Sequence, residues 1–427
     1  MAVRRPILIL LLALAAAASA FAQGLPRGRP ELLGFAPDRL ARIDSLMQRY
    51  VDSGRVAGVV TLVARRGRVV QLGAYGWSDR EAGRRMSPDA IFRIASQSKA
   101  VTSVAVMMLV EEGRLRLADP VSRWLPGFAR ATVATPDTAH PREPLRRPIT
   151  IRDLLTHTAG ISYGTDSLVA PLYRAAGLGP AAGYGWYFAD KTEPICALMD
   201  RLAALPFVAQ PGERFVYGYN TDILGCVVER VSGMPLDQFF SSRIFAPARM
   251  RDTHFFLPAA QRGRLAAVYA ATDRGGIVRA PEGPLGQGSY VDGPRASFSG
   301  GAGLLSTAGD YARFLQMLLN GGALGGARVL APATVALMTQ NQIGTIYDHT
   351  GASGFGLGFD VLLDPGLAGR YGSVGRYGWG GAYATGYWVD PGQNLVAVLM
   401  LQLLPSGGLD IGDRFLTLIY QAIVGPA

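Results

Sequence analysis

One long apolar segment of the chain has to lie inside a folded protein. From Ala100 to Val110 the sequence contains no glycine or proline, and most of its residues are apolar. This pattern predicts a helix that is apolar on nearly every face, and such a helix belongs in the middle of a protein. Gly113 follows two glutamates and is predicted to end the helix. The rest of the chain therefore has to fold around this segment.

The apolar helix is preceded by the tetrad Ser96-Gln97-Ser98-Lys99. Residues three apart share a helix face, so the Ser96 hydroxyl and the Lys99 amine can meet. Ser96 is expected to open the helix, where backbone N–H groups lack intrahelical partners and favour negative charge. A serine beside a basic group is the pattern of an activated nucleophile. The alternative interpretation is a capping serine followed by a lysine that reaches solvent.

Composition favours the nucleophile. The chain has 42 Lys and Arg residues, yet Lys99 and Lys191 are its only lysines. Arginine stays charged in proteins, whereas a buried lysine can lose its proton. A lysine one turn from a serine, within an apolar helix, therefore indicates a need for an amine that can exchange a proton.

Residues 1–22 have the pattern of a cleavable signal peptide. Two arginines precede an apolar run over residues 7–18, and Ala20-Phe21-Ala22 is a small-x-small cleavage site. The apolar run is too short to favour spanning a membrane. We expect the mature chain to begin near Gln23 and to be periplasmic or secreted, with no stable membrane span after cleavage.

Charge and composition exclude several other classes. The net charge is +10, but the arginines are scattered among acids, so we expect no nucleic-acid partner. The four histidines are also scattered, without metal-ligand spacing, so we expect no metal and no cofactor. Cys196 and Cys226 lie in helix-like segments, and the sequence leaves open whether they pair or remain free thiols. The oligomeric state is also left open.

Strand-like segments occur near both ends of the chain, and the middle is mainly helical. The expected strands are Val59–Ala64, Val69–Tyr75, Phe355–Leu363, Tyr383–Val389 and Leu395–Gln402, and the expected flanking helices are Pro37–Gly54 and Asp410–Ile423. The simplest assembly is an α/β protein of the α+β type, in which one largely antiparallel sheet is flanked by helices. We expect one hydrolase domain over residues 23–427. Its sheet lobe would comprise residues 23–95 and 295–427, and its helical lobe residues 96–294.

Two further segments are candidates for the chemistry that a Ser–Lys pair needs. Tyr217 lies on a loop before a helix and can supply the acid, although a half-buried packing aromatic fits equally well. Trp379-Gly380-Gly381-Ala382 is expected to open the strand at Tyr383, and its glycines let a backbone edge approach a ligand. The Ala382 and Ser96 N–H groups would then form an oxyanion hole. A simple turn into an edge strand explains the same residues.

The chain resembles the serine β-lactamase and penicillin-binding-protein superfamily, in its class C-like branch. Ser96-x-x-Lys99 is similar to the nucleophile motif of that superfamily. The segments Leu154-Leu155-Thr156-His157-Thr158-Ala159-Gly160 and Leu224-Gly225-Cys226-Val227-Val228-Glu229 resemble its helical segments. The resemblance runs from about Pro37 to the C-terminus and implies a β-lactamase/transpeptidase-like fold.

Two departures from the superfamily pattern bear on the substrate. The family Tyr-x-Asn is Tyr217-Gly218-Tyr219 here, and Asn220 comes one place late; another alignment makes Tyr219 the catalytic tyrosine. The Lys-Thr-Gly of class C lactamases is replaced by Trp379-Gly380-Gly381, which resembles the family VIII carboxylesterases. The resemblance implies that Trp379, Gly380, Gly381 and Asn220 bind substrate.

The expected function is that of an exported serine hydrolase that acts on a small-molecule ester, lactam or peptide through an acyl-enzyme on Ser96. Lys99 and Tyr217 would share the proton transfers, and a carboxylesterase fits best. A class C-like β-lactamase or a D-alanyl-D-alanine carboxypeptidase is the alternative, because Arg295 or Arg376 could replace the missing cation. A non-catalytic binding protein on the same fold is the alternative of another class.

Overall fold

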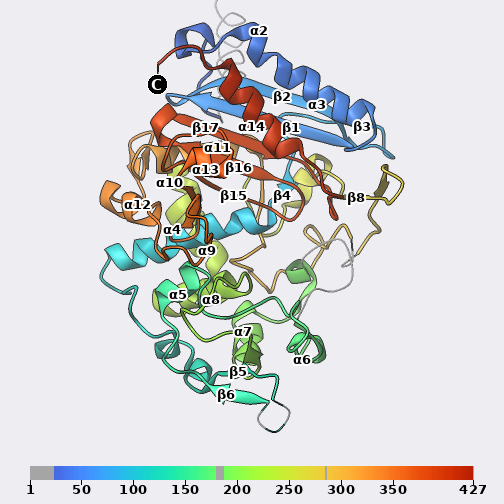
Figure 1. Cartoon of the computed structure of the whole chain (residues 1–427). Coiled ribbons are helices and arrows are strands. Elements are labelled where there is room, and N and C mark those ends of the chain that lie inside the picture. Colours follow the sequence, from blue (N-terminus) through green and yellow to red (C-terminus); the bar gives the residue numbers. More distant parts are fainter. Residues whose placement is uncertain (1–23, 138, 140, 179–186, 284–285, 427) are drawn as a thin grey trace, which may run out of the picture.

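The computed structural model describes residues 24–426, apart from residues 138, 140, 179–186 and 284–285. The predicted signal peptide, residues 1–22, lies outside the described residues. The fold is built on one large antiparallel sheet with helices on both faces (Figure 1). Below the sheet in that view, a mostly helical part surrounds the predicted apolar helix.

The central sheet combines strands from both ends of the chain. Its order is β13-β14-β15-β16-β17-β1-β2-β3, and every neighbouring pair is antiparallel. The strands are β1 (Gly58–Arg65), β2 (Arg68–Asp79), β3 (Arg84–Arg85), β13 (Ser353–Phe355), β14 (Asp360–Leu362), β15 (Tyr377–Gly380), β16 (Gly386–Asp390) and β17 (Leu395–Met400). β1 pairs with β17 in the middle, so the predicted α/β fold with a sheet built from both termini is confirmed.

Successive side chains of the central strands point to opposite sides of the sheet. Both sides are covered, so these side chains are buried in two different cores. In β1, Val59 and Val63 join the core beneath α2 (Pro37–Leu40), α3 (Arg42–Asp52) and α14 (Ile411–Ala422). Val60 and Leu62 join the larger core on the other face, which contains α11 (Ala308–Leu319). In Figure 1, α2, α3 and α14 lie above the sheet.

The predicted apolar helix is α4 (Ser98–Glu111), and it lies in the larger core. Every residue from Ser98 to Leu109 is buried, which confirms the expectation of a central helix. α4 packs mainly against α8 (Asn220–Ser232), which in turn contacts α5 (Ile151–Leu155) and α7 (Ile195–Ala203). The division of the chain into lobes at residues 95 and 294 stays a prediction.

Two predicted strands are wrong in their extent. Phe355–Leu363 is not one strand, because Gly358 has φ of +99° and a turn between Phe355 and Asp360 separates β13 from β14. Trp379 does not open the strand predicted at Tyr383. It lies on β15, and a turn that includes Ala384 at φ +64° separates it from β16. A run of β-formers gave no sign of these backbone reversals.

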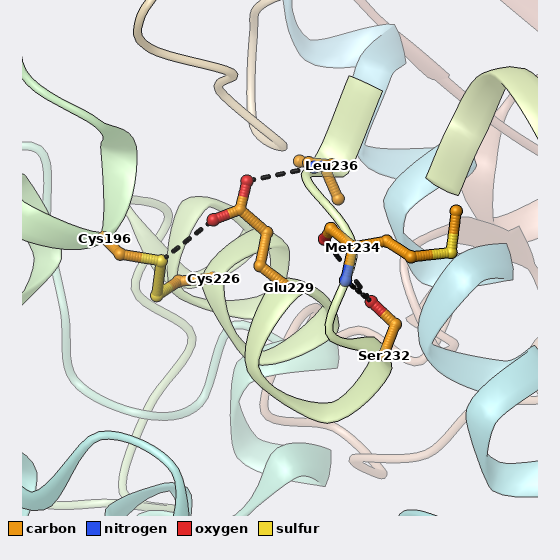
Figure 2. The surroundings of a disulfide bond; sticks show 6 residues. All are labelled: Cys196, Cys226, Glu229, Ser232, Met234 and Leu236. Carbon is orange, nitrogen blue, oxygen red and sulfur yellow. Dashed lines mark hydrogen bonds between the residues drawn. A yellow bond between two sulfur atoms is a disulfide. The ribbon is translucent and has the colours of Figure 1, made fainter. Parts of the chain in front are cut away.

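Cys196 of α7 and Cys226 of α8 form a disulfide, which settles a question that the sequence left open. The two Cα atoms are 5.2 Å apart. Figure 2 shows the pair beside Glu229, whose Oε2 lies 3.2 Å from the Cys196 sulfur and whose Oε1 accepts a hydrogen bond from the Leu236 N–H. Burial raises the pKa of the Glu229 carboxyl. The disulfide therefore joins α7 and α8, the helices that precede and follow the loop carrying Tyr217.

No helix within residues 24–426, so far as the structure describes them, is both long and apolar enough to cross a membrane. In the same residues, no group of three or more His, Cys, Asp or Glu side chains is arranged to hold a metal ion.

The disulfide is expected to stabilise the fold measurably. The cysteines are 30 residues apart in sequence, so replacing both with alanine should lower the free energy of unfolding by about 2–4 kcal/mol, because the unfolded chain regains loop entropy. Urea unfolding with and without a thiol reductant measures this difference. The double variant is the control, since it should not respond to the reductant. Equal stability of the oxidised parent and the double variant would contradict the prediction.

Candidate active site

Ser96 lies in a short 3-10 turn, η2 (Ala95–Gln97), directly before α4. The expectation that Ser96 opens the α-helix is therefore wrong by one turn. The turn follows β4 (Phe92–Arg93) and is closed by a hydrogen bond of 3.0 Å from the Gln97 N–H to the Ile94 carbonyl. Ala95 has φ of +43°, an uncommon conformation for a non-glycine residue that is often found at functional sites. Between Ile91 and Ala100, Ser96 is the residue that is not fully buried.

Lys99 is 2% exposed, and its amine contacts three oxygen atoms. It donates to Ser96 Oγ over 3.2 Å, to the Tyr163 hydroxyl over 2.9 Å and to the Gly301 carbonyl over 2.7 Å. The serine and the lysine thus meet, as their spacing predicts. Three acceptors match the three donors of a lysine ammonium, so the buried charge is well solvated by the protein.

Tyr217 lies beside Lys99 on the loop that precedes α8. Its ring centre is 4.7 Å from the Lys99 amine, and its hydroxyl accepts a hydrogen bond of 3.1 Å from Trp379 Nε1. Tyr219, the alternative in the sequence pattern, is 3% exposed and packs against Tyr163 in the core. Gly218 allows this arrangement, because a Cβ there would lie 2.1 Å from the Ile161 carbonyl. The structure therefore places Tyr217, rather than Tyr219, next to the amine.

Tyr163 is a site residue that the sequence reasoning missed. It is buried, and its hydroxyl accepts the hydrogen bond from Lys99. Burial raises the pKa of the Tyr163 phenol well above its usual range, so the phenol stays neutral. Gly160 and Gly164 flank this segment, and both have positive φ. These two glycines were the available sign that the chain turns sharply here, but they do not point to a role in proton transfer.

The turn after β15 lies against the nucleophile. A Cβ at Gly381 would lie 2.4 Å from the Ile94 carbonyl, so only glycine permits this approach. Ala382 packs in a small cluster with Ala95, which precedes Ser96. The structure thus brings Gly380, Gly381 and Ala382 to the side of η2, where an oxyanion hole was expected.

Asn220, expected to bind substrate, is instead fully buried. Its amide donates to the carbonyls of Ile161 and Val216 over 3.3 and 3.1 Å, and lies 2.9 Å from His157 Nδ1. The His157 ring packs against Tyr217 with ring centres 4.8 Å apart. Burial, with a smaller effect of the Lys99 charge, holds the pKa of His157 well below its usual value. Asn220 therefore supports a neutral histidine behind Tyr217.

Aromatic rings line the side of the site beyond Tyr217. Trp379 is 5.5 Å from Tyr217 and 5.4 Å from Phe355, measured between ring centres. Phe215 and Tyr347 continue this cluster from Phe355 at 5.0 and 5.3 Å. This side of the site therefore presents aromatic surface next to the catalytic cluster, and Asp360, Arg370 and Arg376 line the same pocket as Trp379 and Tyr347.

The two arginines considered as replacement cations are both engaged by backbone carbonyls. Arg376 is 4% exposed and donates to the Tyr371 carbonyl. Arg295 donates to the carbonyls of Leu257 and Val291 over 3.1 and 3.0 Å.

This cluster of a serine, a buried lysine and a tyrosine can be compared with known proteins. A model of the Beta-lactamase family matches residues 43–422. The chain belongs to the beta-lactamase family. Protein Rv1367c of Mycobacterium tuberculosis is 37% identical over 85% of this chain and 90% of that protein. Esterase EstB of Burkholderia gladioli is 34% identical over 86% of this chain and 91% of that protein.

A solved structure agrees with these relatives. EstCE1, described as a hydrolase with promiscuous acyltransferase activity, has a TM-score of 0.77 and 32% identity, covering 91% of this chain and 99% of its own. The predicted superfamily and its esterase-like branch are confirmed. The protein is a serine hydrolase with the β-lactamase fold.

The carbonyl of Gly301 is expected to be needed for the position of Lys99. In Gly301→Ala, the new Cβ would lie 2.5 Å from Asp222 Oδ2, so either the Asp222 carboxylate or the backbone at residue 301 must shift, and the contacts that fix the Gly301 carbonyl are disturbed. We expect kcat/KM for ester hydrolysis to fall by about 10- to 100-fold, since small misplacements near a reacting group have effects of this size.

Gly309→Ala on α11 is the matched control, because a Cβ there approaches only Thr307 Oγ1, at 3.9 Å. That variant should keep the parent activity. A folded Gly301→Ala protein with unchanged kcat/KM would contradict the prediction.

Proposed function

We propose that the protein is an exported carboxylesterase-like hydrolase that forms an acyl-enzyme on Ser96. The observation that carries the proposal is the contact of the Lys99 amine with both Ser96 and Tyr217. The amine donates to Ser96 Oγ and lies 4.7 Å from the centre of the Tyr217 ring, and the Tyr217 hydroxyl accepts a hydrogen bond from Trp379. A nucleophile, a base within hydrogen-bond distance and a group that orients the base are the parts that covalent catalysis needs.

The reaction proceeds in two halves. Ser96 Oγ attacks the ester carbonyl as its proton passes to Lys99 and Tyr217, and the same pair returns a proton to the departing alcohol. Water then attacks the acyl-enzyme, gives a proton to the pair and releases the acid, and Ser96 regains its proton. The backbone N–H groups of Ser96 and Ala382 stabilise the oxyanion in both halves. Lys99 and Tyr217 act as a coupled pair, so either can hold the proton in acylation.

Esters are the favoured substrates because the site offers an aromatic wall where a carboxylate-bearing substrate needs a cation. Trp379 presents apolar surface and gives its indole N–H to Tyr217. Arg295 and Arg376 are already held by backbone carbonyls. The names of the relatives EstB and EstCE1, an esterase and a hydrolase, support the same choice.

A class C-like β-lactamase or D-alanyl-D-alanine carboxypeptidase is the second candidate. The family match favours it, since the Ser96–Lys99 pair can equally open a lactam or cleave a peptide. A non-catalytic binding protein is disfavoured by the contact between Ser96 and Lys99, which a binding role does not require.

Export is proposed from two features. The pattern of residues 1–22 is that of a signal peptide. The disulfide between Cys196 and Cys226 is typical of proteins that fold in an oxidising compartment.

The assignment of the nucleophile is tested by Ser96→Ala. This variant should lose hydrolysis of p-nitrophenyl butyrate and labelling by a fluorophosphonate, because both reactions need the Ser96 oxygen. Ser45→Ala is the control, since Ser45 is exposed on α3 and should be replaceable without loss. Intact-mass spectrometry after mixing with an activated ester locates the acyl group. Labelling that persists in Ser96→Ala would refute the assignment.

The substrate class is tested by comparing kcat/KM for p-nitrophenyl butyrate, nitrocefin and a D-alanyl-D-alanine peptide. We expect the short ester to have the highest value, because its acyl group needs no cation. Trp379→Phe is an informative variant, since it keeps the apolar surface and loses the hydrogen bond to Tyr217. The order of substrates should persist in it. A higher kcat/KM for the lactam or the peptide would replace the esterase proposal with the second candidate.

A further inference from the structure

Asp222 is a fully buried acidic residue in the first turn of α8, the helix that follows the Tyr217 loop. Burying an ionised carboxylate is costly unless it is paired or hydrogen-bonded. None of the catalytic steps proposed above uses Asp222, so its position close to the reacting groups requires an explanation.

The contacts of Asp222 tie down one short segment, Ser299–Ala302, which we call the strap. Oδ1 accepts a hydrogen bond from the Ser299 hydroxyl and another, of 3.1 Å, from the Gly301 N–H. Oδ2 is buried and has no hydrogen-bond partner among the described residues. It faces Gly301, where a Cβ would lie 2.5 Å away. The carboxylate thus packs directly on the strap and binds it at two points.

The strap is also held from the other side by α4. Thr102, one turn after Lys99, donates to the Gly300 carbonyl over 2.7 Å. A Cβ on Gly300 would lie 2.7 Å from the Thr221 carbonyl of α8. The strap therefore lies tightly between α4 and α8, and the carbonyl of its Gly301 accepts the hydrogen bond from Lys99. Two hydrogen bonds through a single residue, Gly301, therefore connect Asp222 with the Lys99 amine.

The positive charge of Lys99 also reaches Asp222. Burial raises the pKa of the Asp222 carboxyl, and the positive charge of Lys99 opposes that rise. The two groups are therefore close enough to interact through space as well as through the strap.

We propose that Asp222 is a positioning residue for Lys99: it fixes the strap whose Gly301 carbonyl orients the amine. This inference rests on the proposed function, in which Lys99 accepts the proton of Ser96.

The test asks whether the acceptor oxygen of Asp222 is what the site needs. Asp222→Ala removes the acceptor for the Ser299 hydroxyl and the Gly301 N–H. Its kcat for ester hydrolysis should fall by about 10²-fold with KM little changed, because the amine is then misplaced beside Ser96. Asp222→Asn keeps an oxygen for both donors and should restore most of that loss.

Asp310→Ala is the matched control. Asp310 is also buried, which raises the pKa of its carboxyl to about 6, and it accepts hydrogen bonds of 2.7 and 3.0 Å from the Asp252 N–H and the Thr253 hydroxyl. The loss of its carboxylate can change the melting temperature but should leave kcat near the parent value. A merely structural role for Asp222 would give the same result at both positions.

A folded Asp222→Ala protein with the parent kcat would overturn the inference, and so would an Asp222→Asn protein as impaired as Asp222→Ala. If Asp222→Ala does not fold, Ser299→Ala decides, because it removes one of the two hydrogen bonds that fix the strap and should lower kcat by a smaller factor; an unchanged kcat there would overturn it too. Hydrolysis that persists in Ser96→Ala would instead defeat the proposed function. Inactive Ser96→Ala with a parent-like Asp222→Ala would defeat the Asp222 inference alone.

Discussion

The site depends on keeping one amine buried and fully hydrogen-bonded. Lys99 is 2% exposed, and Ser96, Tyr163 and Gly301 each supply an oxygen to it. An ammonium group in such surroundings is costly without these partners, and a lysine that is held this way can exchange its proton with a neighbouring hydroxyl. Each partner comes from a different part of the chain, so the whole fold is needed to assemble them.

Strand pairing and close backbone packing explain how those parts meet. β4 leads into η2, and β10 (Leu305–Ser306), which follows the strap, pairs with β4. The end of β15 approaches η2 closely because Gly381 carries no side chain. Segments some 200 and 290 residues beyond Ser96 are thereby fixed against the nucleophile by backbone pairing and close packing rather than by flexible side chains. This arrangement suits a reaction that needs a preorganised site.

Much of this could be predicted from the sequence, and the reasons for the rest are physical. The Ser96–Lys99 contact follows from helical spacing, and the buried helix α4 follows from its apolar run. The sheet from both termini follows from the β-rich segments at the two ends. Tyr163, Gly301 and Asp222 could not be predicted, because their importance arises from tertiary contacts with Lys99 or with one another. The pairing of Cys196 with Cys226 likewise required the distance between two helices.

Trp379 links the catalytic cluster to the choice of substrate. In the related Lys-Thr-Gly pattern this position carries a cation, whereas here an indole donates to the hydroxyl of Tyr217 and packs on Phe355. A cation at this position would attract anionic substrates, whereas the indole leaves Lys99 as the cation in contact with Tyr217. The strap behind Lys99 is held by Thr102 of α4 and Asp222 of α8. The replacement thus changes what the site can attract, while the orientation of the amine depends on groups behind the site.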